Sequence, residues 1–371
     1  MPRQALAFRV PMRHPGDTSG VAGLFDAGSL QPGEVVAILG KTEGNGCVND
    51  FTRAYAVSAL AAVLGARLGT SPEAVIERVA LVMSGGTEGG LSPHFLVLGV
   101  REVSAPASGA LALGVGFTPD FAPEDIGRMA QLRATAKAVR AAMAQAGITD
   151  PGEVHYVQVK CPLITSAKVV DAAARGHSVA THETYASMGL SRGAAALGVA
   201  LALGEQDETA LSDAVIGHDW RLHSSRASCS AGVELERCEV IVLGNSPDWA
   251  GDLRIGHDVM RDAIDLPAVQ RALGSVGLPG PGQLDDMSRE RLIAVLAKAE
   301  PSTTGLIRGL RHIMGDDSDI HATRHARAVV GGVIAAAVGR TDLFISGGAE
   351  HQGPDGGGPV AVIARRAQAG R

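Results

Sequence analysis

The chain has 371 residues and a formal net charge of −6, and no block of lysines or arginines interrupts it. This charge pattern argues against a nucleic-acid partner or an anionic membrane surface, while the 46% of hydrophobic residues is enough for packed cores. Since the N-terminus shows no signal-peptide pattern and the four scattered cysteines form no CxxC motif, we expect a cytoplasmic protein with reduced thiols.

Three segments along the chain share a short apolar run that ends at a lysine. They are residues 33–44 (GEVVAILGKTEG), 152–163 (GEVHYVQVKCPL) and 289–300 (RERLIAVLAKAE). Each run is rich in β-branched residues and predicts a buried strand. The lysines are Lys41, Lys160 and Lys298. Because the chain has five lysines in all, three at one repeat position indicate an internal repeat.

An arginine follows each of these lysines and opens an alanine-rich segment that predicts a buried helix. The three segments begin at Arg53, Arg192 and Arg324, and a glycine closes each one. A further amphipathic helix is predicted over 124–147. Its weaker counterparts in the other units are expected at 258–274 and in the apolar tract before Gly33.

A serine in a small-residue turn is the third repeated feature. Ser84, Ser230 and Ser346 each begin a Ser-(Gly/Ala)-Gly sequence, and a predicted strand follows each one. The order strand–Lys, Arg–helix, Ser–Gly–strand therefore occurs three times. We predict an α+β fold of three structurally similar α+β repeat units around a pseudo-threefold axis, near residues 1–105, 112–250 and 254–371.

Equivalent residues of three such units would meet at the axis. The centre would then hold three lysines, three arginines and three serines, and we expect no matched carboxylate to neutralise them. Such a cationic centre favours a small, electron-rich guest of threefold shape. A lysine whose pKa is lowered by burial can take a serine proton, and nearby N–H donors can stabilise an oxyanion. This chemistry indicates acyl transfer, most simply amide or imide hydrolysis. The alternative is a small-molecule binding protein without catalysis.

Five motifs carry a resemblance to a known family. They are GKTEGNGCVNDFTRAYA, MSGGTEGGLSPHF, VQVKCPLIT, RASCSAGVELE and FISGGAEHQGPDGGGP, which are spread over nearly the whole chain. With them the chain resembles the cyanuric acid amidohydrolase/barbiturase family. The resemblance implies three similar domains, one active site at their junction, and a homotetramer. It also implies hydrolytic opening of a cyclic imide, with cyanuric acid favoured here as the substrate and barbituric acid as the alternative.

The resemblance also implies roles for individual residues. Lys160 and Ser230 resemble the working base and nucleophile, a choice that the repeated sequence alone does not make. The remaining matched residues would bind the ring, namely Lys41, Arg53, Ser84, Gly85, Arg192, Ala231, Lys298, Arg324, Ser346 and Gly347, together with Ser230 itself. No organic cofactor is expected. A structural divalent cation, Mg²⁺ or Ca²⁺, is implied near the C-terminus by Glu300, Ala349, Gln352, Gly353, Pro354 and Gly357.

Overall fold

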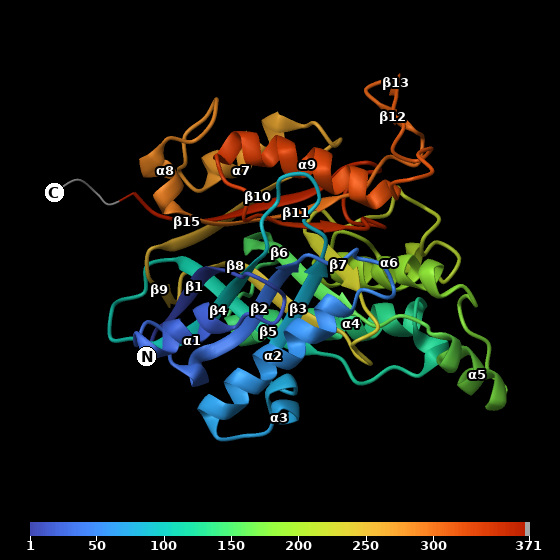
Figure 1. Cartoon of the computed structure of the whole chain (residues 1–371), viewed down its shortest axis with the longest axis horizontal. Helices are drawn as coiled ribbons and strands as arrows, with labels where there is room; N and C mark the ends of the chain where they lie inside the picture. The colour runs from blue at the N-terminus through green and yellow to red at the C-terminus, as the bar shows by residue number, and fades with distance from the viewer. Residues whose placement is uncertain (368–371) are drawn as a thin grey trace.

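Three mixed sheets, each covered by helices on its outer side, make up the structure, a computed structural model that describes residues 1–367 (Figure 1). The first sheet contains β1 (Arg3–Pro11), β2 (Val35–Thr42), β3 (Ala80–Gly85), β4 (His94–Glu102) and the short β9 (Trp249–Ala250). The second contains β5 (Ala110–Phe117), β6 (Val154–Cys161), β7 (Ala227–Ala231) and β8 (Glu239–Ser246). The third contains β10 (Leu253–Met260), β11 (Leu292–Ala299), β14 (Phe344–Gly347) and β15 (Gly358–Arg365).

The strand order is the same in the three sheets. The orders are β1-β4-β2-β3, β5-β8-β6-β7 and β10-β15-β11-β14, so that the first strand of each unit pairs with its fourth, the fourth with its second, and the second with its third. In every unit the second and third strands run parallel and the other pairs are antiparallel. The α+β fold of three similar units predicted from the repeats is therefore confirmed.

Each unit has a long buried helix after its lysine strand and a second helix earlier in the chain. The long helices are α2 (Phe51–Leu68), α6 (Thr184–Ala202) and α9 (Ala322–Val338), and the earlier ones are α1 (Ser19–Asp26), α4 (Met129–Ala146) and α7 (Leu266–Ser275). Shorter elements are α3 (Pro72–Ile76), α5 (Ser166–Ala174), α8 (Asp286–Arg291), four single 3₁₀ turns, and the hairpin β12 (Leu306–Ile307) with β13 (Leu310–Arg311). Local sequence accounts for two of the long helices, because Asp50 caps the start of α2 and left-handed Gly69 and Gly339 end α2 and α9.

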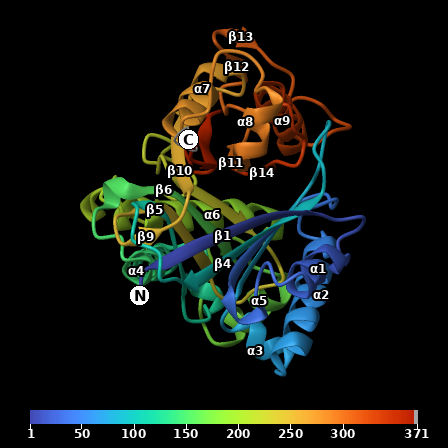
Figure 2. The ribbon, with the colours of Figure 1, turned by 90° about the vertical axis from the view of Figure 1, so that its left-hand side faces the viewer.

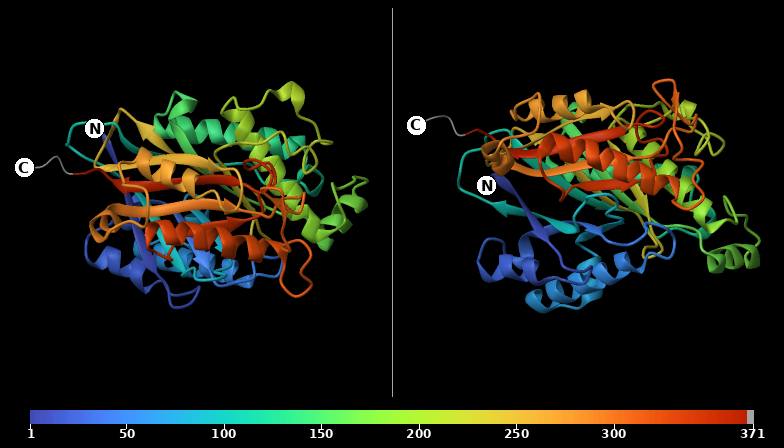
Figure 3. Two further views of the ribbon diagram at one scale, coloured as in Figure 1. Left: turned by 90° about the horizontal axis from the view of Figure 1, so that it is seen from above. Right: turned by 45° about the horizontal axis from the view of Figure 1, so that its top comes forward.

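Figure 2 shows the three units arranged around a common centre, with the sheets inside and most of the helices outside. The two further views in Figure 3 show α7 and α9 of the last unit lying along the outer face of its sheet. The largest cluster of buried apolar residues joins side chains from all three sheets, including Leu39, Val159 and Leu296. The units therefore share a core instead of packing as separate domains.

The strand register aligns each lysine with the serine of its own unit. In the parallel pairs, Lys41 lies opposite Ser84, Lys160 opposite Ser230, and Lys298 opposite Ser346. In each of the three pairs, the lysine and the serine are 43 to 70 residues apart in the sequence. Strand pairing makes them neighbours at the carboxyl ends of two adjacent strands. That edge of an open sheet is where ligand sites commonly form.

The structure differs from the sequence predictions at several elements. The helix expected over 258–274 is a strand, β10, followed by the shorter α7. Arg192 does not open its helix, because α6 begins eight residues earlier at Thr184. The second sheet begins at Ala110, before the expected start of that unit at 112, and residues 249–250 pair with β1 of the first sheet. Apolar residues at helical spacing occur in both β10 and α7, so periodicity alone did not separate them.

Candidate active site

A small cavity at the junction of the three units brings together most of the predicted site residues. Its lining contains Arg53, Ser84, Gly85, Lys160, Arg192, Ser230, Ala231, Ser346 and Gly347, together with Gly46, Met188 and Arg327. Each unit contributes one arginine and one serine turn. The arginines and serines therefore converge as the repeats predicted, Lys160 is, within the described residues, the one expected lysine in this lining, and the cavity is mainly polar.

The three lysines are buried at the contacts between units. Each donates a hydrogen bond to the carbonyl that precedes the serine of a neighbouring unit: Lys41 to Ile345 at 2.5 Å, Lys160 to Met83 at 2.8 Å, and Lys298 to Cys229 at 2.8 Å. All three side chains are at most 1% exposed. These contacts run in one direction around the axis and hold the three serine strands together.

A matched glutamate follows each serine by four residues, contrary to the expectation that no carboxylate occupies a repeat position. Each glutamate pairs with an arginine of the preceding unit: Arg53 with Glu234 at 3.2 Å, Arg192 with Glu350 at 2.6 Å, and Arg327 with Glu88 at 2.5 Å. The glutamates partly neutralise the arginines, so the empty centre is less cationic than the sequence suggested. Comparing the residues downstream of each serine would have revealed them.

Arg327 lines the central cavity with Arg53 and Arg192, whereas Arg324 lines a small neighbouring cavity with Arg192 and Arg327. Arg327 is 2% exposed, pairs with a matched glutamate and lines the central cavity, whereas the Arg324 side chain is 39% exposed and lies 4.0 Å from Glu88. The three arginines are the third residue of α2, the ninth of α6 and the sixth of α9. The three helices therefore begin at different distances from the arginine that each one contributes to the cavity.

The three Lys–Ser pairs are not equivalent. Lys41 lies 3.4 Å from the Ser84 hydroxyl and Lys298 lies 3.1 Å from that of Ser346. In the middle unit, Lys160 instead approaches the Glu234 carboxylate at 3.1 Å, and the buried Ser230 hydroxyl has no hydrogen-bond partner within the described residues. Lys160 is also the lysine found in the lining of the cavity, as far as residues 1–367 show.

Burial lowers the pKa of all three lysines. For Lys298 the pKa falls to about 7, with the nearby Arg192 adding to the effect of burial. For Lys160, burial and Arg53 lower the pKa, and the Glu234 carboxylate opposes them. A lysine with a lowered pKa has a larger neutral fraction near pH 7 and can accept a proton from a hydroxyl. The site therefore holds buried amines of lowered pKa next to serine turns.

A wider cavity of about 600 Å³ leads toward this centre from the surface. It shares Arg192 with the central cavity, and Tyr185 and His321 line its wall. The Tyr185 hydroxyl and Nε2 of His321 are hydrogen-bonded at 2.7 Å across the gap between α6 and the start of α9. The opening therefore reaches Arg192, which is also part of the central lining.

The residues expected to hold a cation are Glu300, directly after β11, and a loop beside β7. The Glu300 carboxylate accepts hydrogen bonds from the Gly348 amide and the Thr323 hydroxyl, which places it at the start of the 349–357 loop. Burial, and then the neighbouring Glu350, raise the pKa of Glu300. The buried Glu300 carboxylate and the side-chain and backbone oxygens of the loop are the type of donor that Mg²⁺ or Ca²⁺ prefers, so the chemistry of these residues fits such an ion. Within the described residues, no cluster of three His, Cys, Asp or Glu side chains offers another site.

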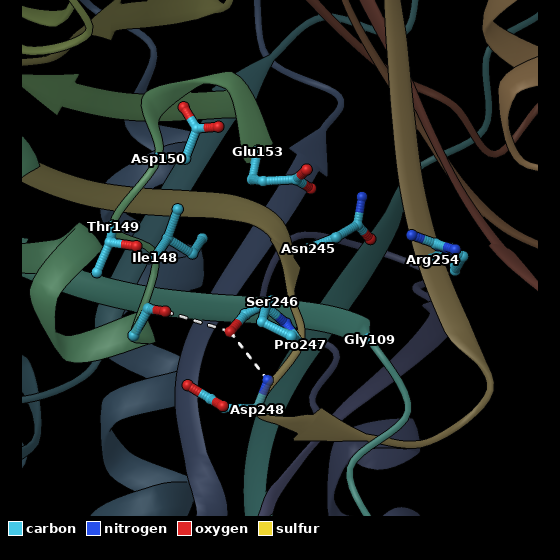
Figure 4. Close-up of a pocket in the computed structure, with 11 residues that line it drawn as sticks. Gly109, Ile148, Thr149, Asp150, Glu153, Asn245, Ser246, Pro247, Asp248 and Arg254 are labelled. Atoms are coloured by element: carbon cyan, nitrogen blue, oxygen red, sulfur yellow. Dashed lines mark hydrogen bonds between the residues drawn. The ribbon is translucent and has the colours of Figure 1, made fainter.

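A second large cavity, of about 470 Å³, lies at the opposite ends of the strands. Figure 4 shows Ser246 at its centre, accepting a hydrogen bond from the Asp248 amide and donating one to the Gly147 carbonyl. Asp150, Glu153 and Arg254 complete much of the wall. Its lining contains no lysine and no serine without a partner, so the chemistry is concentrated in the central cavity.

Comparison with known proteins agrees with this geometry. Residues 7–365 match the family model of the amidohydrolase ring-opening proteins. The chain is 58% identical to the cyanuric acid amidohydrolase of Methylobacterium sp. (strain 4-46), over all of this chain and 99% of that protein. It is 56% identical to the cyanuric acid amidohydrolase of Ectopseudomonas oleovorans (strain CECT 5344), over 96% of this chain and 98% of that one.

Two solved structures are also similar to this chain over nearly its whole length. A cyanuric acid hydrolase described as an evolutionary innovation by structural concatenation aligns with a TM-score of 0.94 and 52% identity, over 98% of this chain and all of that one. The cyanuric acid hydrolase from A. caulinodans aligns with a TM-score of 0.90 and 55% identity, over 99% of this chain and all of that one. Within residues 1–367, no helix has both the length and the apolar character that crossing a membrane requires.

Proposed function

Because the chain belongs to the family of ring-opening amidohydrolases, we propose that it hydrolyses cyanuric acid to carboxybiuret, which then loses CO2 to give biuret. The observation that carries this proposal is the threefold cavity, in which each unit supplies one buried arginine and one serine turn. A flat six-membered ring with three exocyclic oxygens matches that arrangement. An arginine fork suits each of those oxygens, and the serine turns offer hydroxyl and amide donors.

In the proposed reaction, the Ser230 hydroxyl attacks one ring carbonyl while neutral Lys160 takes the hydroxyl proton. Two features support this pair: Lys160 lines the cavity, and the Ser230 hydroxyl is buried without another partner. Amide donors of the serine turns and the nearby guanidinium groups stabilise the oxyanion that forms. When the C–N bond breaks, Lys160 returns the proton to the leaving ring nitrogen. Water then hydrolyses the ester at Ser230 and releases carboxybiuret.

The other residues of the cavity hold the ring in place. Arg53, Arg192 and Arg327 bind exocyclic oxygens, and the turns at Ser84–Gly85 and Ser346–Gly347 contact the remaining edges. The buried Lys41 and Lys298 each support the serine turn of their own unit, because each also donates to the carbonyl of the glycine after that serine, at 3.1 and 3.0 Å. We assign the base to Lys160 for this reason.

A divalent cation, Mg²⁺ or Ca²⁺, is proposed at Glu300 and the loop that contains Ala349, Gln352, Gly353, Pro354 and Gly357. When bound, the ion supplies charge neutralisation and fixes the shape of this loop. The loop matters to the site because the Gln352 side-chain oxygen accepts a hydrogen bond from the Cys229 amide at 2.6 Å, one residue before Ser230. The loop thereby positions the nucleophile strand.

The assembly proposed for the chain is a homotetramer. Several large apolar side chains are exposed in the single chain, among them Leu310 at 76% and Ile313 at 56%, both near the projecting β12–β13 hairpin. Contact between subunits would cover such side chains. The molar mass measured by light scattering should be close to four times 37.9 kDa. A mass equal to one chain would contradict this proposal.

Steady-state hydrolysis of two rings tests the proposed function. Purified protein mixed with cyanuric acid should remove its ultraviolet absorbance and form biuret and CO2 in equal amounts. Barbituric acid, in which a CH2 group replaces one ring NH, should be hydrolysed with a lower kcat/KM. Binding of cyanuric acid without product would support a non-catalytic binding protein, and a higher kcat/KM on barbituric acid would assign the other substrate.

A further inference from the structure

Two of the three matched glutamates are tied to their arginines by two-point ion pairs. Glu88 accepts from Nε and Nη2 of Arg327 at 2.7 and 2.5 Å, and Glu350 accepts from the same atoms of Arg192 at 2.7 and 2.6 Å. This parallel geometry is the strong form of the arginine–carboxylate pair. Both glutamates therefore serve mainly to orient an arginine beside the cavity.

Glu234 breaks this pattern. Its carboxylate lies 3.2 Å from Nε of Arg53 and 3.1 Å from Nζ of Lys160, and neither of its buried oxygens has a hydrogen bond of good geometry. Arg53 is meanwhile held by other groups, since it donates to the Cys47 carbonyl at 3.0 Å and lies 3.5 Å from Asp50. The middle glutamate is thus shared between an arginine and the lysine of its own unit.

The lysines differ in the same way. Three oxygen atoms surround Nζ of Lys41, and three surround Nζ of Lys298, one of them in each case the hydroxyl of the serine in its own unit. Lys160 contacts two oxygens, the Met83 carbonyl and the Glu234 carboxylate. An amine nitrogen has four bonding directions and one is used by its own side chain. One direction at Nζ of Lys160 therefore stays open, and this lysine lines the cavity beside Ser230.

We propose that Glu234 is a positioning residue that selects the middle Lys–Ser pair for catalysis, by holding the Lys160 amine at the cavity wall instead of against its own serine turn. The proposal rests on the assignment of Lys160 and Ser230 as base and nucleophile. It explains how a centre built from three similar units has one reactive pair. Each unit has a glutamate four residues after its serine. In the middle unit that glutamate contacts the lysine as well as an arginine.

Electrostatics gives this proposal a measurable consequence. The charged and titratable groups that face Lys160 are Glu234, Arg53, the Cys161 thiol and, from β8, Glu239. Burial and Arg53 lower the pKa of Lys160, while the Glu234 carboxylate raises it. Because Lys160 must be neutral to accept the Ser230 proton, activity should rise with pH through the pKa of Lys160. Removing the negative charge of Glu234 should move that rise to lower pH.

The test compares two matched substitutions, Glu234→Gln and Glu88→Gln, by measuring kcat/KM against pH on cyanuric acid. Glu234→Gln should shift the acidic limb to lower pH by about one to two units, as expected for loss of an opposite charge within 4–6 Å. It should also lower the maximal kcat. Glu88→Gln should raise KM through Arg327 and leave the limb where it is. Glu239, whose pKa burial raises to about 7, is present in both proteins, and the Glu234 charge adds to that rise.

Glu234→Asp keeps the charge and controls for loss of packing. Its acidic limb should return toward that of the unsubstituted protein even if the shorter side chain lowers kcat. An unmoved limb in Glu234→Gln, or an equal shift in Glu88→Gln, would overturn the proposal. Ser230→Ala separates this failure from a wrong nucleophile: if Ser230→Ala is inactive and the limb does not move, the dyad stands and only the role of Glu234 is wrong.

Discussion

At the scale of single residues, Arg327 completes the ring of arginines. Two of its nitrogens are used by Glu88, and the third, Nη1, lies 2.5 Å from where a Cβ at residue 347 would stand. That nitrogen therefore lies against the Ser346–Gly347 turn. Gly347 has to remain a glycine, because any side chain there would displace both Arg327 and Thr323.

Arg327→Lys and Arg324→Lys form a matched pair of substitutions on one helix. Arg327→Lys keeps the charge but loses the planar fork, so kcat/KM on cyanuric acid should fall by about 10- to 100-fold, the equivalent of one charged hydrogen bond. Arg324→Lys, at an exposed side chain, should change kcat/KM by less than about threefold. Steady-state kinetics on both proteins decides this. A larger loss of kcat/KM in Arg324→Lys than in Arg327→Lys would show that Arg324 binds the ring instead of Arg327.

The residue pattern of the sequence predicted the lysines and serines of the site, but not every arginine or any glutamate. Lys41, Lys160 and Lys298 were recognisable because lysine is rare in this chain and each ends an apolar strand. Arg327 was missed because the first two turns of the third long helix contain two arginines, Arg324 and Arg327, and the repeat pattern did not distinguish them. Which of the two lines the cavity depends on how α9 packs against its neighbours, and the sequence did not define that packing.

At the scale of elements, parallel pairing of the second and third strands of each unit produces the Lys–Ser pairs. A shift of one residue in that register would turn each serine to the other face of its sheet. The apolar runs predicted the lysine strands and the strands that follow the Ser-Gly turns, but the third strand, which carries each serine, was not predicted. The order of strands within each sheet was not predictable, because several orders satisfy the same alternation of apolar segments.

A bound cation should stabilise the 349–357 loop. With Mg²⁺ or Ca²⁺ at Glu300, the loop supports the Cys229 amide through Gln352, so removing the ion should destabilise the folded protein. A chelator should lower Tm by a few degrees, and added Mg²⁺ or Ca²⁺ should restore it. In Glu300→Gln, which lacks the carboxylate, Tm should not respond to chelator. Equal melting curves with and without chelator, in protein that contains no divalent metal by elemental analysis, would contradict the cation site.

At the scale of the whole molecule, three repeated units of one chain form a central cavity that three separate subunits could form by association. The lysine contacts run around the axis in one direction and the arginine–glutamate pairs in the other, so each unit is tied to both of its neighbours. A single chain also allows the units to differ, which three identical subunits cannot do. The differences are concentrated in the middle unit, at Ala231, Glu234 and the unpartnered Ser230 hydroxyl.

The central claim is that only one of three similar serines attacks the ring, and the kcat values of three single alanine variants test it most directly. Ser230→Ala should lower kcat by at least about 1000-fold while its Tm stays near that of the unsubstituted protein. Ser84→Ala and Ser346→Ala should keep most of kcat and raise KM by about tenfold, since each loses one hydrogen bond to the ring. Near-normal kcat in Ser230→Ala, with loss of turnover in either of the other two variants, would contradict the account.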